Sequence, residues 1–447
     1  MTRIPRRRVL ESAAVGAAAL TAAFAGCPLV EDGRPEEREL TTPVDAPDGE
    51  WPDPDWRPAD GIPSEDDVEP TTVVSDLEIP WDLAFAGDEA FITERDGGVR
   101  RFDAAALAEE SGLTPADGET VLAGEALPDR AASGEGGTLG VAPHPDYPDS
   151  PLVYIYYTAD DGGLRNRVVR YDLETDSLER ILEGIPGAST HDGGRIAFGP
   201  DGRLWVLTGD AGNESLAQDP GSLAGAVLRI TADGEPAPDN PDWGDGSDPR
   251  TYTLGHRNPQ GIDFTPAGAP LIAEHGPQSR DEVSLLRPGG NYGWDVVRGG
   301  PNDPKYAGYG EREKATPPLL NTGPDDATWA PSGIEFYDDG TIQAWRNRLF
   351  VAGLVSETLF AVSLEPSDND GSGAAGDDES IRFDADWLDD RFAVTARPLF
   401  DGEYGRLRTV ETGPDGSPFL LTSNRDGRAQ GAFPREDDDR IVRLDPA

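Results

Sequence analysis

The chain has 447 residues and a formal net charge of −47 at pH 7, with a sequence pI near 4.2. Negative charge of this size repels nucleic-acid phosphates and anionic lipids, so a polyanionic partner is excluded. The length would suit two or three average domains, but a closed all-β architecture can use this many residues as one unit.

The basic residues are almost all arginine, because lysine occurs only at Lys305 and Lys314. A surface rich in Asp and Glu and poor in Lys suits concentrated salt, which screens the self-repulsion of so charged a chain. We therefore expect a halophilic source, and the alternative is an acidic secreted protein from a mesophile. The composition informs habitat more than function.

Residues 1–27 have the composition of an export signal. Three arginines at 6–8 precede an Ala-rich apolar run at 13–25 that is too short to span a bilayer comfortably. The twin-arginine pattern predicts export of a folded protein. The single cysteine, Cys27, follows AFAG as in a lipobox, so we expect an extracytoplasmic protein attached to the membrane only by a lipid on Cys27. The alternative is an inert cysteine in the leader.

Two further segments are predicted to lack a fixed fold. Residues 28–68 are rich in Pro, Asp and Glu and have few aliphatic side chains to bury, which predicts a disordered tether. An acidic, Gly/Ser-rich stretch at about 367–379 predicts a mobile surface loop. The folded domain is then expected to span residues 69–447.

An internal repeat fills this domain. Each unit has a short apolar strand, a turn with Asp, Gly or Pro, a second apolar strand, and a third strand that ends in a charged residue. The PDG-type turns favour tight connections between antiparallel strands. Six units begin near Trp81, Leu139, Arg195, Gly261, Gly333 and Val410.

Six units of three or four short strands predict an all-β fold, a six-bladed β-propeller of four-stranded antiparallel blades. An irregular sandwich with similar hairpins is the alternative. In a propeller, ligands bind where loops converge at one end of the central channel, so we expect the irregular motif loops to meet there.

The most irregular segment runs from Gly255 to Trp294. It contains GHRNPQG, EHGP, an adjacent Asp and Glu, and GGNYGW within about 40 residues. Polar and glycine residues this dense do not fit the pattern of a core strand, so the segment is predicted to form part of a binding or catalytic site.

Five strings occur in a fixed order along the chain: EGGTLGVAPHPDY, HDGGRIAFGPDGRLWVLTGD, the block just described, WAPSG and GRLRTVETGPDG. From about Pro80 onward the chain resembles the soluble quinoprotein glucose and aldose sugar dehydrogenases. The resemblance implies a calcium-containing propeller that uses pyrroloquinoline quinone (PQQ). Such an enzyme oxidises an aldose at C1 to the lactone and passes electrons to an external acceptor.

Oxidising a hydroxyl needs a base that takes its proton while hydride leaves the carbon, and histidine suits this role near neutral pH. Of the four histidines, His144 lies in a PHPDY turn and is expected to be structural. His191 precedes GGR, where glycines allow a ligand to approach closely. The resemblance implies that His191 is the catalytic base and that Asp210 orients it. It also implies that Arg257 stabilises charge growing on the quinone oxygen.

The quinone carries three carboxylates, so its site needs cations and hydrogen-bond donors. Two arginines alternate on one predicted strand and so share a face, although they are alternatively a solvated pair. His256 and Gln260 are assigned supporting roles. The cofactor-binding residues implied by the resemblance are Glu135, Arg257, Asn258, Pro331, Ser332, Arg406 and Arg408.

Calcium prefers oxygen ligands, including backbone carbonyls, which a loop rich in Gly and Pro can present. The resemblance implies that Gly276 and Pro277 bind the calcium that activates the quinone. It adds Glu282 and Tyr292 as calcium ligands, the tyrosine through its main chain. The alternative makes Asp281 and Glu282 ordinary surface acids.

Three positions depart from the glucose dehydrogenase branch and argue against strict identity with it. Val355 stands where a lysine contacts the cofactor, Glu135 where a glutamine lines the site, and Thr190 where an acid precedes the catalytic histidine. Glu135 adds a negative charge beside a polyanion unless calcium or an arginine compensates. A calcium-dependent sugar lactonase and a non-catalytic sugar-binding propeller remain open as other functions.

Overall fold

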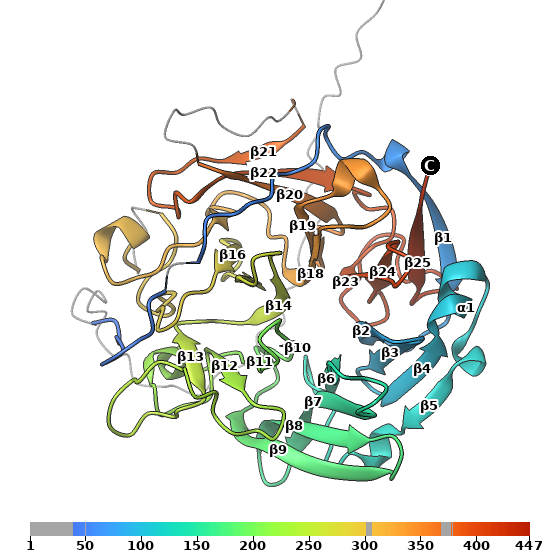
Figure 1. The fold of residues 1–447 in the computed structure, drawn as a ribbon, viewed down its shortest axis with the longest axis horizontal. Helices are drawn as coiled ribbons and strands as arrows, with labels where there is room; N and C mark the ends of the chain where they lie inside the picture. Colours follow the sequence, from blue (N-terminus) through green and yellow to red (C-terminus); the bar gives the residue numbers. More distant parts are fainter. Residues whose placement is uncertain (1–38, 50, 301–305, 368–376, 378) are drawn as a thin grey trace, which may run out of the picture. The chain divides into compact units, whose positions relative to one another are not determined.

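The computed structural model describes residues 39–49, 51–300, 306–367, 377 and 379–447. The predicted export signal, the first part of the predicted tether and most of the acidic stretch lie outside these residues. In the described part, six antiparallel sheets are arranged around a common centre (Figure 1). This arrangement confirms the predicted six-bladed propeller and rules out the sandwich.

The first three blades each contain four strands that pair in chain order. Their strands are β2 (Pro80–Ala86), β3 (Glu89–Glu94), β4 (Val99–Asp103) and β5 (Glu119–Leu122); β6 (Thr138–Pro143), β7 (Leu152–Asp160), β8 (Leu164–Asp172) and β9 (Ser177–Pro186); and β10 (Ile196–Phe198), β11 (Leu204–Leu207), β12 (Ala226–Ile230) and β13 (Thr251–Leu254).

Blade five differs from the prediction because a fifth strand, β21, pairs with the outer edge of β22. Blade six joins the two ends of the domain, since β1 pairs antiparallel with β25 and so closes the ring. The strands of blades four to six are β14 (Pro259–Phe264), β15 (Pro270–Glu274), β16 (Glu282–Leu285) and β17 (Leu320–Asn321); β18 (Pro331–Tyr337), β19 (Arg348–Gly353), β20 (Leu359–Pro366), β22 (Phe392–Leu399) and β21 (Ile381–Phe383); and β23 (Leu407–Thr412), β24 (Pro418–Thr422), β25 (Ile441–Pro446) and β1 (Val68–Val74).

Helices in the described residues are short. The α-helix α1 (Ala104–Glu109) is capped by the side chain of Asp103, which accepts a hydrogen bond from Ala106 N. None of the described helices has the length or apolar character needed to cross a membrane. The 3₁₀ segments are η2 (Glu65–Asp67), η3 (Pro115–Asp117), η4 (Gly124–Ala126), η5 (Glu214–Gln218), η6 (Tyr309–Glu311) and η7 (Gln343–Trp345).

The PDG turns form the tight connections that the sequence predicts. Between β10 and β11, Gly202 has a φ of 70°, a left-handed conformation that favours glycine. The side chain of Asp201 accepts a hydrogen bond from Arg203 N at 3.0 Å and so closes the turn. The strand that follows is buried along its whole length, because neighbouring blades cover both of its faces.

Residues 39–67 depart from the disordered tether expected at 28–68, because a few of their side chains anchor the segment on the propeller. Trp56 is buried in the core of blades four and five. Its ring centroid lies 4.8 Å from that of Phe336 and 5.9 Å from that of Phe392. Leu40 is also buried. Two buried apolar side chains can anchor an extended segment. The average composition of the segment does not reveal such isolated anchors.

Bulges in the first strands of blades four, five and six re-aim polar side chains. The pairing shifts at Gln260 in β14, near Ser332 in β18 and at Arg408 in β23. As a result, Arg408 Nη1 lies 3.0 Å from Gln260 Oε1 and 3.4 Å from Ser332 Oγ. Three blades therefore contribute to one polar cluster.

The same three strands carry Asp263, Glu335 and Glu411. Burial raises the pKa of Asp263 to about 7. Burial and the neighbouring carboxylates raise the pKa values of Glu335 and Glu411 well above their usual range. The folded protein therefore holds protons here that the unfolded chain would release near neutral pH.

We predict that Glu335→Gln stabilises the protein at neutral pH. A group with a higher pKa in the folded state favours folding at low pH, and this contribution is lost as pH rises from about 4 through 7 and above. The variant should raise the free energy of unfolding by about 1 to 2 kcal/mol near pH 8 and flatten its fall between about pH 5 and 8. Denaturant unfolding at constant high salt measures this. The exposed Glu69→Gln serves as control, and a Glu335 variant less stable than the parent at pH 8 contradicts the prediction.

Candidate active site

A hydrogen-bonded pair of His191 and Asp210 lies at the centre of the candidate site. His191 is in the loop between β9 and β10, and Asp210 follows β11. Their Nδ1 and Oδ1 atoms are 2.8 Å apart. The carboxylate holds a proton on Nδ1, which leaves Nε2 as the acceptor of neutral imidazole. The His191 side chain is 20% exposed, whereas that of Asp210 is 2% exposed.

The HDGG sequence allows the His191 loop to approach β11 closely. His191 itself has a φ of 60°. A Cβ atom on Gly193 would lie 2.5 Å from the carbonyl oxygen of Leu207, so only glycine fits there. Gly193 N donates to Asn258 Oδ1 at 3.1 Å. The loop is therefore fixed both to its own blade and to blade four.

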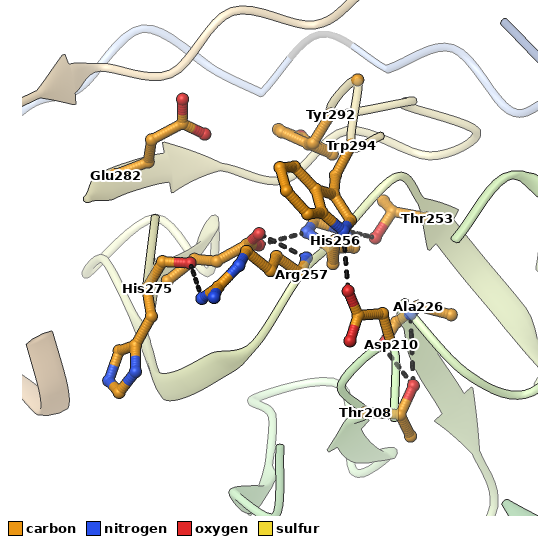
Figure 2. A network of polar contacts seen from close by, with 12 residues as sticks. Thr208, Asp210, Ala226, Thr253, His256, Arg257, His275, Glu282, Tyr292 and Trp294 are labelled. Carbon is orange, nitrogen blue, oxygen red and sulfur yellow. Dashed lines mark hydrogen bonds and ion pairs between the residues drawn. The ribbon is translucent and has the colours of Figure 1, made fainter. Parts of the chain in front are cut away.

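Three donors hold the carboxylate of Asp210. Besides His191, Gly212 N lies 2.7 Å from Oδ1. Trp294 Nε1 lies 2.8 Å from Oδ2 (Figure 2). The backbone N–H of Asp210 donates to the carbonyl of Arg257 at 2.8 Å. The orientation of the His191 ring thus depends on segments that are distant in sequence.

Glu135 holds the His191 loop from the other side. Its Oε2 accepts a hydrogen bond from His191 N at 2.9 Å, and its Oε1 lies 3.0 Å from Arg428 Nη1. Burial alone would raise the pKa of Glu135, but the His191 N–H and the charge of Arg428 hold it below its usual value. Arg428 is therefore the compensating arginine that a carboxylate at this position requires.

Arg406, just before β23, and Arg408, within β23, are both buried but differ in their ion-pair partners. Arg406 pairs with Asp426 through Nη2 at 2.8 Å and also donates to the Leu354 carbonyl at 3.0 Å. Arg408 makes no ion pair with any described residue, and its Nε atom has no hydrogen-bond partner. Burial lowers the pKa of Arg408 to about 9, and the neighbouring charge of Arg406 contributes to this shift. The site therefore contains a buried cation without its own counter-ion.

An open cavity of about 860 Å³ lies beside these residues. Glu135, Arg406 and Arg428 line it, together with His275 and the exposed side chain of Val355. This volume exceeds what a monosaccharide alone needs. The cavity has room for a cofactor and a substrate together.

His275 faces this cavity and a second, smaller one. Burial lowers its pKa to about 3, so the ring is neutral near physiological pH. Asn258 Nδ2 lies 3.4 Å from His275 Nδ1, which assigns the ring proton to Nε2. That Nε2 atom is buried and has no hydrogen-bond partner among the described residues. It is a donor available to a ligand.

All four predicted metal-binding residues line the smaller cavity, which has a volume of about 20 Å³. A space of this size holds one water molecule or one ion. Arg257 also lines this cavity, with Nη1 3.2 Å from the His275 carbonyl and its guanidinium 5.6 Å from the centre of the Trp294 ring. Arg257 therefore lies with the predicted metal residues and does not line the open cavity. The four residues are Gly276, Pro277, Glu282 and Tyr292.

Glu282 is the main acidic side chain of the small cavity. Tyr309 Oη lies 3.1 Å from its Oε2, and Asn321 Nδ2 lies 2.8 Å from its Oε1. Burial and the charge of Glu274 raise the pKa of Glu282 to about 8. The carbonyl of Tyr292 accepts from Tyr309 Oη at 2.7 Å, so this tyrosine presents its main chain to the site. Glu282 forms no ion pair with any described residue. A bound cation would neutralise its negative charge.

The carbonyl of Pro277 accepts a hydrogen bond from Arg298 Nη2 at 3.1 Å. In the described part of the chain, no group of three or more His, Cys, Asp or Glu side chains is arranged to hold a metal ion. An ion in the small cavity would therefore need main-chain carbonyls, water or a second ligand to complete its coordination.

Asp281 is a buried structural residue, so it is not the surface acid that the alternative interpretation required. Its Oδ1 accepts from Gly276 N at 2.9 Å. Its Oδ2 accepts from Thr328 Oγ1 at 2.8 Å, from Trp329 N at 2.7 Å and from Ala330 N at 3.1 Å. This carboxylate ties the EHGP turn of blade four to the WAPSG loop of blade five.

The remaining predicted residues support the site. His256 is fully buried and bridges Thr253 and Glu274 at 2.9 and 2.8 Å. Pro331 begins β18 and pairs with Gly353 in β19. These contacts agree with a supporting role for His256. Pro331 contributes to the backbone pairing of blade five next to the site.

Four side chains that contribute to the site are absent from the sequence prediction. Arg428 and Asp426 lie in the loop between β24 and β25, where no recognisable motif marks them. His275 and Trp294 lie inside the predicted block, but the prediction gives neither side chain a role. One feature of the sequence could have indicated Arg428: the carboxylate expected at Glu135 requires a cation beside it.

The propeller carries an oriented His–Asp pair and an arginine-lined cavity. This combination is typical of an enzyme active site. Residues 77–431 match the family model described as Glucose / Sorbosone dehydrogenase. The chain belongs to this family.

Among its relatives, the chain is 32% identical to quinoprotein glucose dehydrogenase B of Acinetobacter calcoaceticus, over 67% of this chain and 75% of that protein. It is 31% identical to aldose sugar dehydrogenase YliI of Escherichia coli K12, over 80% of this chain and 91% of the relative. A solved structure of the PQQ-bound aldose sugar dehydrogenase of Streptomyces coelicolor is 32% identical, with a TM-score of 0.63 over 86% of this chain and 99% of the other.

Proposed function

We propose that this protein is a quinoprotein dehydrogenase that binds PQQ and oxidises an aldose at C1 to the lactone, delivering electrons to an external acceptor. The observation that carries the proposal is Arg408, a buried guanidinium with no carboxylate partner in the described residues. A buried cation is costly unless an anion neutralises it. The carboxylates of PQQ would supply that anion, and a PQQ-bound relative supports the assignment.

Other side chains of the site fit the same group. The buried Nε2–H of His275 has no hydrogen-bond partner among the described residues and suits a carbonyl or carboxylate oxygen. Two more buried polar residues lie beside these donors: Asn258 next to His275, and Ser332 next to Arg408. Arg428 neutralises Glu135 at 3.0 Å, so the carboxylate at this position does not repel an anionic cofactor.

The chain's own residues handle the substrate proton. Asp210 keeps the proton of His191 on Nδ1, so Nε2 accepts the proton of a sugar hydroxyl. Glu135 fixes the backbone of His191 and prevents the loop from turning away. When bound, PQQ supplies the hydride acceptor. The exposed Val355 at the open cavity agrees with an aldose site that differs from that of a strict glucose dehydrogenase.

Reconstitution of the apo protein with PQQ and Ca²⁺ in high salt tests this function. A panel of aldoses with an artificial electron acceptor should give turnover only when both additions are present. Sugar should change the near-ultraviolet absorbance of the bound quinone. His191→Gln should lower kcat by about 100-fold or more, because the general base is lost, while quinone binding persists.

His144→Gln is the matched control, since His144 Nδ1 accepts a hydrogen bond from Asp146 N in a turn. It should keep parental turnover. Failure to bind quinone under these conditions sinks the dehydrogenase assignment. Hydrolysis of sugar lactones with calcium alone would instead identify a lactonase. Sugar binding that His191→Gln leaves unchanged, without turnover, would identify a binding module.

We also propose that the small cavity binds Ca²⁺. Glu282 would provide a carboxylate, and Gly276, Pro277 and Tyr292 would provide main-chain oxygens. The bound ion would act as a Lewis acid beside the quinone. The volume of about 20 Å³ admits one ion, in agreement with this assignment.

Glu282→Gln should weaken calcium binding by about tenfold or more, because a neutral amide replaces the carboxylate ligand. Calorimetric titration of the apo protein without quinone measures the affinity directly. Glu313→Gln, which alters an exposed acid in the η6 region, is the control. Equal calcium affinity in the parent and the Glu282 variant would place the ion elsewhere.

We further propose that the protein is exported and anchored by a lipid on Cys27, as its leader sequence predicts. Cys27→Ala should move the protein from the membrane fraction to the soluble extracytoplasmic fraction without loss of reconstituted activity. An unchanged membrane fraction would contradict the lipid anchor.

A further inference from the structure

We propose that Thr41 and the segment around it position the catalytic pair of the propeller. The segment of residues 39–49, here named the strap, reaches Asp210 through one chain of hydrogen bonds that is part-buried at Thr41 and Gln218 and buried at Asp210. The strap precedes the part of the chain that matches the family model, residues 77–431. The inference rests on the proposed roles of His191 and Asp210.

Thr41 makes three hydrogen bonds to the propeller. Its N–H donates to Gln218 Oε1 at 3.2 Å, and its Oγ1 donates to the Gln218 carbonyl at 2.8 Å. Its own carbonyl accepts from Asn291 Nδ2 at 2.9 Å. The preceding side chain, Leu40, is buried with Val296 and Val297. The strap is therefore anchored at this point by polar and apolar contacts together.

Gln218 and Asn291 connect Thr41 to Trp294. Gln218 Nε2 donates to the Trp294 carbonyl at 2.6 Å and to Asn291 Oδ1 at 3.0 Å. Asn291 Nδ2 donates in return to Gln218 Oε1 at 2.8 Å, and Asn291 Oδ1 accepts from Gly293 N at 2.9 Å. Asn291 is 2% exposed. The two amides thus fix the main chain on both sides of position 293.

Trp294 carries this constraint to the catalytic carboxylate. Its Nε1 donates to Asp210 Oδ2 at 2.8 Å (Figure 2). The residue is 8% exposed, and its ring stacks on that of Tyr306. Oδ1 of the same carboxylate meets His191 Nδ1. A shift of the Trp294 main chain therefore turns Asp210 and, with it, the His191 ring.

The strap has a structural alternative that experiment can separate. A segment that only stabilises the fold would change the melting temperature and leave the site unaffected. A positioning segment changes the orientation of His191 at temperatures where the protein is fully folded. Errors of about 1 Å in a catalytic group can cost about 100-fold in rate, so a partial loss of orientation should be measurable.

Thr41→Pro removes both the N–H and the hydroxyl donor of the strap. Thr41→Val removes only the hydroxyl. Thr42→Val alters the exposed neighbouring residue and is the matched control. Trp294→Phe removes the indole donor to Asp210. It shows how large an effect to expect when the hydrogen-bond connection from Thr41 to Asp210 is fully broken.

We expect Thr41→Pro to lower kcat by about tenfold with KM changed less than about twofold. Thr41→Val should fall between this variant and the parent, and Thr42→Val should match the parent. In the apo protein, ¹⁵N signals of the His191 ring should move in the same direction in Thr41→Pro and Trp294→Phe. The four histidines of the chain make these signals assignable.

A lower melting temperature in Thr41→Pro with unchanged His191 signals and unchanged kcat would overturn the inference. Gln218→Glu covers the case in which Thr41→Pro does not fold, because it keeps the acceptor for Thr41 and loses the donor to Trp294. Unmoved His191 signals in this variant overturn the inference equally. If the parent shows no sugar oxidation while the histidine signals move as expected, the proposed function fails and the positioning role holds.

Discussion

The carboxylate of Asp210 is the interaction on which the rest of the site depends. It is almost fully buried, and a carboxylate in such a place must satisfy its lone pairs with fixed donors. Its partners come from the loops before and within blade three, through His191 and Gly212, and from the β16–β17 loop of blade four, through Trp294. A propeller can supply these partners because its blades carry their loops to a common place (Figure 1).

Bulges and glycines convert this regular scaffold into a specific one. The first strands of blades four to six would alternate side chains evenly without bulges, and Gln260, Ser332 and Arg408 would not meet. Gly193 lets the His191 loop lie against β11. Asp281 then locks two neighbouring loops together through four donors. Local irregularity, held by a repetitive core, brings the functional groups into register.

The sequence predicted the propeller because its period is short and local, with PDG turns between apolar strands. It also marked the His191 and Asp210 motifs and the cluster that lines the small cavity. It did not predict Arg428, because a partner 293 residues away leaves no local pattern. It missed the packing of residues 39–67 for a related reason: burial of Leu40 and Trp56 depends on a surface that forms only when the blades are assembled.

The distribution of positive charge also follows from these constraints. In a chain with a net charge of −47, exposed acids attract arginines to the surface, as in the pairing of Arg170 with Glu179 and Asp233. Arg408 is buried away from such partners, beside Arg406, whose charge Asp426 neutralises. Arginine keeps its charge under these conditions better than lysine, since a lowered pKa of about 9 still leaves it protonated near neutral pH. Within a protein of high negative charge, this buried guanidinium is therefore a local positive charge that a small anion can neutralise.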